Sequence, residues 1–201
     1  MLGALLRNLV RPKKTLIAHP NLRLHIGGKA RHPDWRVLDV LPGDHVDFVG
    51  PCTDLSRFAD SSITEIYASH VLEHLGYQAD LPRALAEFRR ALIPGGLLRV
   101  SVPDLTTLCT LFLDPELADR DRFNVMRMIF GGQLDAADFH RVGLTEEILA
   151  VYLRSAGFVD VVRVQDLAAF NDMSRFVYKD TPISLNVTAR KPAAAASDDD
   201  C

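Results

Sequence analysis

The chain has 201 residues, of which 48% are hydrophobic and 24% are charged, as is usual for one globular domain with a sizeable core. The net charge of −3 comes from three aspartates near the C-terminus, so acidic and basic residues balance over the remainder. This balance argues against tight nucleic-acid binding, and no apolar run reaches the ~18 residues of a membrane span.

Residues 1–14 form a basic leader segment without an acidic residue. Its leucines fit one face of a short helix, which would suit docking to a membrane surface or a partner. The simpler interpretation, which we favour, is a frayed or self-packed leader. It does not resemble a signal peptide, because its charges follow the apolar stretch. Residues 15–190 then form a single domain.

Four short apolar segments predict strands in the first third of this domain, at residues 22–26, 36–40, 46–49 and 63–69. The fourth is apolar at most positions, which predicts burial on both faces. A helix follows, with Asp80 as its predicted N-cap and Pro82 in its first turn. The sequence Pro94-Gly95-Gly96 ends this helix before another strand at residues 97–102.

The second half of the chain continues the alternation. Residues 104–130 predict a helical stretch broken near Pro115, and Thr145 is the predicted N-cap of a further helix. Strands are expected at residues 158–164 and 183–189. Residues 105–143 interrupt the alternation and form the predicted helical cap. The Ala-rich and then acidic residues 191–201 are expected to be disordered.

Strands that alternate with helices predict an α/β fold with a mostly parallel sheet and helices on both faces. Ligands of such sheets bind beyond the carboxyl ends of the strands. Gly27 and Gly28 follow the first strand, where glycine lets a ligand approach the backbone. Asp39 ends the second strand, where a carboxylate can accept hydrogen bonds from both hydroxyls of a ribose. Taken singly, each feature also fits an ordinary turn or a solvated acid.

Several motifs together resemble those of the class I S-adenosylmethionine-dependent methyltransferases, in particular a short-loop variant of the type 11 family. Residues 69–75 read SHVLEHL, like the elbow after the fourth strand of that family, and residues 92–98 read LIPGGLL, like its turn before the fifth strand. Residues 155–158 resemble its AGF step. Asp54 and Leu55 resemble its adenine-side loop.

The resemblance implies a Rossmann-like seven-stranded sheet, mostly parallel with the last strand antiparallel, and S-adenosyl-L-methionine as the cofactor. It also implies that six residues bind this cofactor. Gly27 and Gly28 would approach the methionine part, Asp39 would bind the ribose, Asp54 and Leu55 would border the adenine, and His70 would line the methyl side. The acceptor implied is a small molecule or a glycan-like compound, methylated at oxygen.

A second hypothesis is a catalytically inactive binding or scaffold protein with a methyltransferase fold. The family's glycine loop has an acid and three glycines, whereas this chain has His25 in place of the acid and two glycines. Pro51 also stands where a polar residue often meets the adenine. The complete elbow and Asp39 favour the enzyme.

Two histidine motifs bear on the chemistry. His140 lies in the predicted cap and is our candidate catalytic residue, because a histidine near neutral pKa can deprotonate an acceptor hydroxyl. A surface or hinge histidine is the alternative. His70, Glu73 and His74 match the His-x-x-Glu-His motif of inverted zinc proteases, but the motif straddles a strand end. We therefore expect no metal, with Glu73 and His74 holding the elbow by local hydrogen bonds.

The three cysteines are widely spaced and form no CxxC pair. An odd number with this spacing predicts neither a disulfide framework nor a zinc site. Free cysteines are typical of a reducing compartment, so we expect a cytoplasmic protein.

Overall fold

A computed structural model describes residues 21–194. The expectations for the basic leader at residues 1–14 and for residues 195–201 of the tail lie outside this range. Over the described residues, no helix has both the length and the apolar character needed to cross a membrane.

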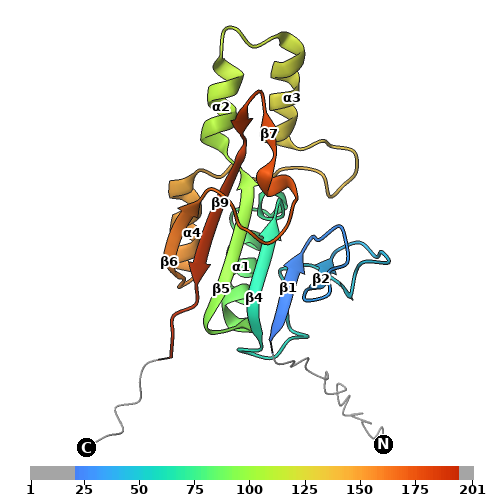
Figure 1. Cartoon of the computed structure of the whole chain (residues 1–201), viewed down its shortest axis with the longest axis vertical. Helices are drawn as coiled ribbons and strands as arrows, with labels where there is room; N and C mark the ends of the chain where they lie inside the picture. The colour runs from blue at the N-terminus through green and yellow to red at the C-terminus, as the bar shows by residue number, and fades with distance from the viewer. Residues whose placement is uncertain (1–20, 195–201) are drawn as a thin grey trace, which may run out of the picture.

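Seven strands form one sheet in the order β3-β2-β1-β4-β5-β9-β6 (Figure 1). The neighbours from β3 to β5 pair in parallel, whereas β9 is antiparallel to both β5 and β6. The predicted seven-stranded, mostly parallel sheet is therefore confirmed, including the antiparallel last strand. The strands span Leu22–Ile26 (β1), Arg36–Asp39 (β2), Phe48–Val49 (β3), Ile63–Ser69 (β4), Leu92–Pro103 (β5), Val159–Val164 (β6) and Ser184–Arg190 (β9).

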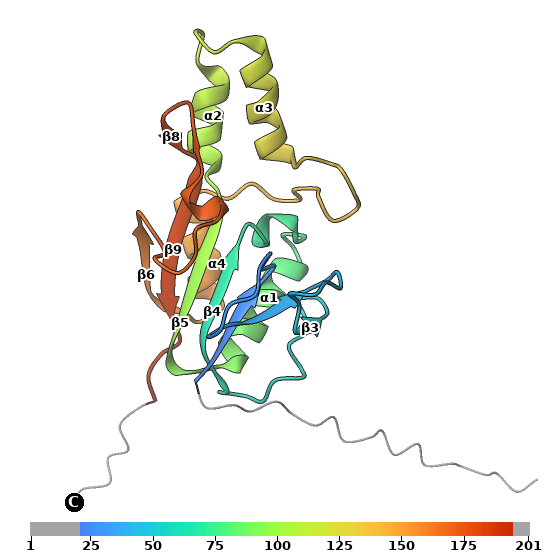
Figure 2. The ribbon, with the colours of Figure 1, turned by 45° about the vertical axis from the view of Figure 1, so that its right-hand side comes forward.

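Two helices, α1 (Asp80–Ala91) and α4 (Glu146–Ser155), pack together on one face of the sheet (Figures 1 and 2). The buried leucines of α1 lie at helical spacing, as predicted. The helix begins at Asp80 itself, with Ala79 as the N-cap and no capping hydrogen bond from a side chain. Thr145 caps α4 as expected, since its hydroxyl accepts from the amide of Ile148.

The other face of the sheet differs from the expectation of helices on both sides. Within the described range, the segment of residues 165–176 crosses this face, and the short 3-10 helix η2 (Met173–Arg175) is its only helical turn. Trp35, Tyr67 and Leu167 form a separate buried cluster beneath it. The links between β1 and β2 and between β2 and β3 are too short for packed helices, so aromatic side chains fill the space instead.

The cap stands beyond the carboxyl ends of the strands (Figure 2). It consists of α2 (Leu105–Leu113) and α3 (Asp119–Phe130), and the break near Pro115 falls between them as predicted. A hairpin of β7 (Val177–Tyr178) and β8 (Thr181–Pro182) joins these helices through a shared apolar core. This hairpin was not predicted, because strands of only two residues leave no recognisable pattern.

The loop of residues 51–62 is fastened to α1 by one arginine. The Arg90 guanidinium donates to the backbone carbonyls of Leu55 and Phe58 and to the carboxylates of Glu87 and Asp60. Glu87 in turn accepts from the amide of Leu55 at 2.8 Å. The hydrogen bond that Arg90 donates to Glu87 lowers the pKa of this carboxyl below its ordinary value.

We predict that Arg90→Met lowers the free energy of unfolding by about 2 kcal/mol, because it leaves two loop carbonyls and a carboxylate without their donor. Urea unfolding at pH 7 measures the change. Arg83→Met is the matched control, since Arg83 is exposed on the same helix. Equal stability of the two variants would contradict the prediction.

The same ion pair makes stability depend on pH. Because the folded pKa of Glu87 is lowered, Glu87 adds to the free energy of unfolding above its unfolded pKa near 4.5, and this contribution is lost as the pH falls through the folded value.

Candidate functional site

The turn after β1, at Gly27 and Gly28, lies against the elbow after β4. Gly27 has a φ of +72°, and a Cβ built on it would lie 2.8 Å from Cγ2 of Val71. A Cβ on Gly28 would lie 2.7 Å from the ring of His25. Both positions therefore require glycine, and they leave backbone close to the elbow at the carboxyl edge of the sheet.

Asp39 lies beside this turn, at the end of β2, and is 8% exposed. One carboxylate oxygen accepts from the amide of Leu41 at 2.9 Å. The other faces the Lys29 ammonium at 3.4 Å. The lysine side chain is 84% exposed, so this ion pair contributes little and can open when another donor competes.

The adenine-side residues divide between surface and core. Asp54 is exposed, and its carboxylate accepts from the amide of Ser56 at 3.0 Å. Leu55 is fully buried in the main core, and its amide and carbonyl bind Glu87 and Arg90. The Leu55 side chain therefore lies inside the protein, and of this pair Asp54 alone is exposed on the side predicted for the adenine.

His25 stands where the resemblance to methyltransferases would place an acidic residue. Its ring lies 4.1 Å from that of Phe170 and 4.9 Å from that of Tyr67, centroid to centroid. Burial lowers the pKa of His25 to about 4, against a smaller opposite effect of the nearby Asp172 carboxylate. At neutral pH the ring is thus uncharged and packs as an aromatic side chain.

The elbow itself begins at His70, whose φ is +53°. The Nε2 atom of His70 lies 3.0 Å from the Ser184 hydroxyl, and its Nδ1 atom lies 3.3 Å from a carboxylate oxygen of Glu73. The 3-10 helix η1 (Leu72–His74) follows directly. His70 therefore lies between Ser184 at the start of β9 and Glu73 of η1.

Glu73, His74 and His140 come together although His140 is far along the chain. Each offers one ligand atom, and these three atoms lie within 4.8 Å of one another. The rings of His74 and His140 meet edge to face at 4.8 Å. The backbone carbonyl of Glu73 accepts from the amides of Arg141 and Val142, at 2.7 and 3.3 Å, which fixes the segment after His140 against the elbow.

His140 is half-buried and its Nδ1 atom lies 3.3 Å from the carbonyl of Ile129. Burial lowers the pKa of His140, and the neighbouring Glu73 carboxylate opposes this effect. A carbonyl only accepts hydrogen bonds, so Nδ1 carries the proton and Nε2 carries a lone pair. His140 thus has the form required of a base or a metal ligand.

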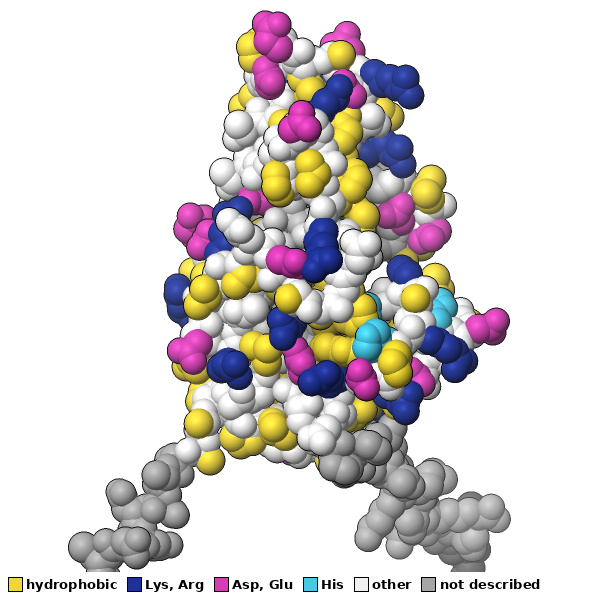
Figure 3. Space-filling model, in the orientation of Figure 1, with side chains coloured by type: hydrophobic (Ala, Val, Ile, Leu, Met, Phe, Trp, Pro, Cys, Tyr) yellow, Lys and Arg dark blue, Asp and Glu magenta, His cyan; other side chains and the backbone are white. Residues whose placement is uncertain are grey.

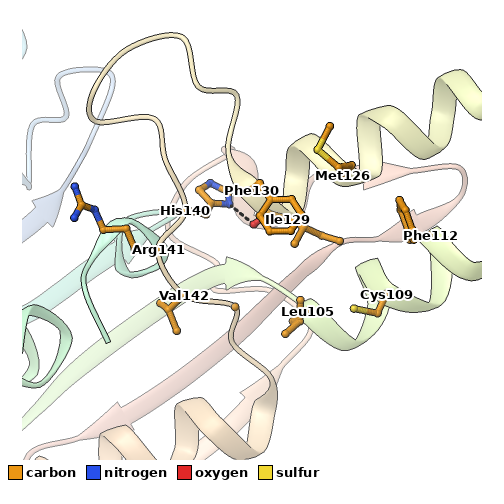
Figure 4. A pocket seen from close by; sticks show the side chains of 10 residues that line it. Leu105, Cys109, Phe112, Met126, Ile129, Phe130, His140, Arg141 and Val142 are labelled. Atoms are coloured by element: carbon orange, nitrogen blue, oxygen red, sulfur yellow. Dashed lines mark hydrogen bonds between the residues drawn. The ribbon is translucent and has the colours of Figure 1, made fainter. Parts of the chain in front are cut away.

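A cavity of about 500 Å³ opens between α2, α3 and residues 140–143 (Figure 4). Its lining is mainly apolar, and His140 and Arg141 lie on the side toward the elbow. The apolar residues are Leu105, Cys109, Phe112, Met126, Ile129, Phe130 and Val142. The cavity can hold a small molecule with an apolar body and a polar group toward His140.

Outside this cavity the surface is mixed. Figure 3 shows Lys and Arg side chains interspersed with Asp and Glu over the face viewed, with hydrophobic side chains over the cap. The described cap residues with large exposed apolar side chains include Leu113 and Phe123, and Val177 of the adjoining hairpin is also exposed. No single basic patch is visible on this face.

Comparison with known proteins agrees with this architecture. A family model described as "Methyltransferase domain" matches residues 31–100. A SAM-dependent methyltransferase from Archaeoglobus fulgidus has a TM-score of 0.58 at 15% identity, over 85% of this chain and 86% of that one. No curated protein sequence matches the chain.

Two further solved structures have the same fold. One is the 1,6-didemethyltoxoflavin-N1-methyltransferase of Burkholderia thailandensis, with bound 1,6-didemethyltoxoflavin and S-adenosylhomocysteine. Its TM-score is 0.51 at 20% identity, over 86% of this chain and 72% of that one. The other is a SAM-dependent methyltransferase from Thermotoga maritima, with a TM-score of 0.51 at 16% identity, over 85% and 82% of the two chains. The resemblance to class I methyltransferases is therefore confirmed, and at these identities the structures establish the fold.

We predict that His25 makes the protein less stable in mild acid. Its folded pKa of about 4 lies below the unfolded value of 6.5, so its contribution is complete above pH 6.5 and declines as the pH falls toward 4. The full loss is on the order of 3 kcal/mol. Urea unfolding of wild type and His25→Phe between pH 7 and pH 4 measures it, and the variant should lose less stability. Parallel curves would show that His25 is not the cause.

Proposed function

We propose that this protein is a methyltransferase that transfers the methyl group of S-adenosyl-L-methionine to an oxygen atom of a small acceptor. The observation that carries the proposal is the position of the elbow. Val71 contacts the space beside Gly27, and three residues later the elbow meets His140 at the wall of the apolar cavity. The elbow thus has the proposed cofactor side on one flank and the acceptor cavity on the other. We call the cofactor side, formed by Gly27, Gly28, Asp39, Asp54 and His70, the donor edge.

The donor edge fits the cofactor in its essential parts. A Cβ at Gly27 or Gly28 would meet Val71 or the His25 ring, so these glycines keep the backbone of the turn close to the elbow, where the methionine part would bind. Asp39 has a carboxylate at the sheet edge that can bind the ribose hydroxyls once Lys29 moves into solvent. Asp54 borders the adenine side, and His70 lines the methyl side.

When bound, S-adenosyl-L-methionine supplies a methyl group on a positively charged sulfur, which is already activated for displacement. The protein therefore needs chiefly to place the acceptor oxygen in line with that methyl group and to assist loss of its proton. The cavity supplies the first requirement. His140, at the polar side of the cavity, supplies the second.

The lining of the cavity favours one acceptor class over the other that the sequence left open. Aromatic and aliphatic side chains surround most of it, and these desolvate an apolar molecule well but offer few partners for the hydroxyls of a sugar. A small hydroxylated compound with an apolar body fits better than a glycan. A cytoplasmic location is part of this proposal, on the basis of the free thiols of Cys52 and Cys109.

A catalytically inactive binding protein is the second candidate. The neutral His25 ring packed on Phe170 and the Lys29–Asp39 ion pair favour it, since both use groups that would otherwise face the cofactor. The two candidates differ in whether the donor edge binds S-adenosylmethionine at all.

Titration calorimetry with S-adenosylhomocysteine tests the donor edge. We expect micromolar binding by wild type and an affinity 10- to 100-fold lower for Asp39→Ala, because a hydrogen bond to a charged group contributes about 1.5–3 kcal/mol. Asp44→Ala is the control, since Asp44 is exposed on the loop after β2. Absence of binding by folded wild type would favour the scaffold candidate.

Filling the cavity should block the acceptor and spare the cofactor. Cys109 lines the cavity and is exposed, so Cys109→Trp adds volume there without disturbing a core. We expect the rate of methyl transfer to the best phenol or hydroxy acid from a panel to fall at least 10-fold, with unchanged affinity for S-adenosylhomocysteine. Cys109→Ala is the matched control and should retain the rate. Equal rates in the two variants would place the acceptor elsewhere.

A further inference from the structure

The three side chains that meet at the elbow form a site by themselves. We call Glu73, His74 and His140 the elbow cluster. Two imidazoles and one carboxylate are typical ligands of divalent transition metals, and the three ligand atoms lie within 4.8 Å of one another. The cluster lies at the wall of the apolar cavity and not at the Asp39 edge.

The Glu73 carboxylate lacks the hydrogen-bond partners that a buried acid requires. Its side chain is 2% exposed, and neither carboxylate oxygen has a hydrogen-bond partner among residues 21–194. His70 approaches one of them at 3.3 Å, but without hydrogen-bond geometry. A buried carboxylate without partners is costly, so a cation at this position would relieve a large cost.

The two histidines of the cluster are prepared as ligands. The Nδ1 atom of His74 lies 3.2 Å from the carbonyl of Phe139, and that of His140 lies 3.3 Å from the carbonyl of Ile129. Each carbonyl fixes the proton on Nδ1 and leaves a lone pair on Nε2. A backbone carbonyl that orients an imidazole in this way is the usual outer partner of a metal-binding histidine.

His70 lies beside the cluster and faces Glu73. The Ser184 hydroxyl donates to the carbonyl of Met173 at 2.8 Å, so it accepts from Nε2 of His70. In the neutral ring the Nδ1 atom of His70 therefore carries a lone pair 3.3 Å from a Glu73 carboxylate oxygen and cannot donate to it. Only the imidazolium form of His70 would pair with Glu73, so a metal ion would compete with a protonated His70 for this carboxylate.

We propose that Glu73, His74 and His140 bind one divalent metal ion of the zinc type. Two histidines and one glutamate are a known ligand set of catalytic zinc, which keeps a fourth position open for water or substrate. Zinc–ligand bonds of about 2.0–2.2 Å would draw the ligand atoms together by roughly 1 Å from their present separation. Small rotations of the half-buried histidine side chains suffice for this change.

The arrangement differs from that of the zinc proteases that share the His-x-x-Glu-His motif. In those enzymes both histidines of the motif bind the metal and the glutamate acts as a base. Here His70 lies outside the cluster, Glu73 is a ligand, and the second histidine comes from the distant segment after α3. The motif alone therefore does not predict this site, because His140 lies outside it.

The metal would act on the acceptor, and this part of the inference rests on the proposed function. A hydroxyl that enters the cavity can bind at the open fourth position, where the metal favours its deprotonated form and the proton leaves to solvent. His140 then positions the acceptor as a ligand of the metal instead of removing the proton itself.

Metal analysis of the purified protein and zinc titration of EDTA-treated protein test the site. We expect one equivalent of zinc bound at micromolar concentration or below. Glu73→Gln and His140→Ala should each weaken binding at least 10-fold, whereas His45→Ala should not change it, since His45 lies outside the cluster. Melting temperatures establish that the variants are folded.

Cobalt provides a second measurement on wild type alone. Co²⁺ in a site with few ligands gives intense visible bands, whereas Co²⁺ surrounded by water gives weak ones. Weak bands, no zinc uptake by folded wild type, or equal uptake by Glu73→Gln and His140→Ala would overturn the proposal. Binding of S-adenosylhomocysteine, measured on the same samples, tests the donor edge separately, so failure of one proposal does not imply failure of the other.

Discussion

Two hydrogen bonds to one carbonyl hold the candidate site together. The Glu73 carbonyl accepts from the amides of Arg141 and Val142, which ties the segment below the cap to the elbow after β4. The contact of His74 with the carbonyl of Phe139 and the backbone hydrogen bond from Leu105 to Leu144 add to this link on either side of His140. With it, side chains from two segments far apart in the sequence meet at one edge of the sheet, and the cavity gains a polar wall.

The donor edge and the acceptor side are built by different means. The donor edge depends on absent side chains at Gly27 and Gly28 and on a single carboxylate whose present partner is an exposed lysine. The acceptor side depends on an apolar enclosure and on the backbone hydrogen bonds from Arg141 and Val142 to the Glu73 carbonyl. Such backbone hydrogen bonds hold their geometry, whereas an exposed ion pair opens easily. The acceptor side is therefore the better organised of the two before any ligand binds.

The fold followed from the sequence because strand and helix periods and the Thr145 N-cap are local signals. Pro94-Gly95-Gly96 was expected to separate the helix from the strand, but α1 already ends at Ala91 and these three residues lie within β5. The candidate donor residues followed from their place at strand ends. What the sequence could not give is the meeting of Glu73 with His140, since tertiary packing alone brings them together. The aromatic cluster on the second face of the sheet, which we call the aromatic face, was not predicted for the same reason. Its rings, those of His25, Tyr67 and Phe170, come from three segments, and no segment alone shows a pattern.

The aromatic face also bears on how a short-loop domain remains stable. A helix after β1 would normally cover this side of the sheet, but nine residues between β1 and β2 leave no room for it. The chain instead turns residues 165–176 back over the sheet, where a neutral histidine packs among aromatic rings. Because the same histidine ring fills the space at Gly28, the packing that replaces the helix also shapes the donor edge. Loss of the helix and the changed glycine loop are thus one structural adaptation, and a cofactor bound there must fit against His25.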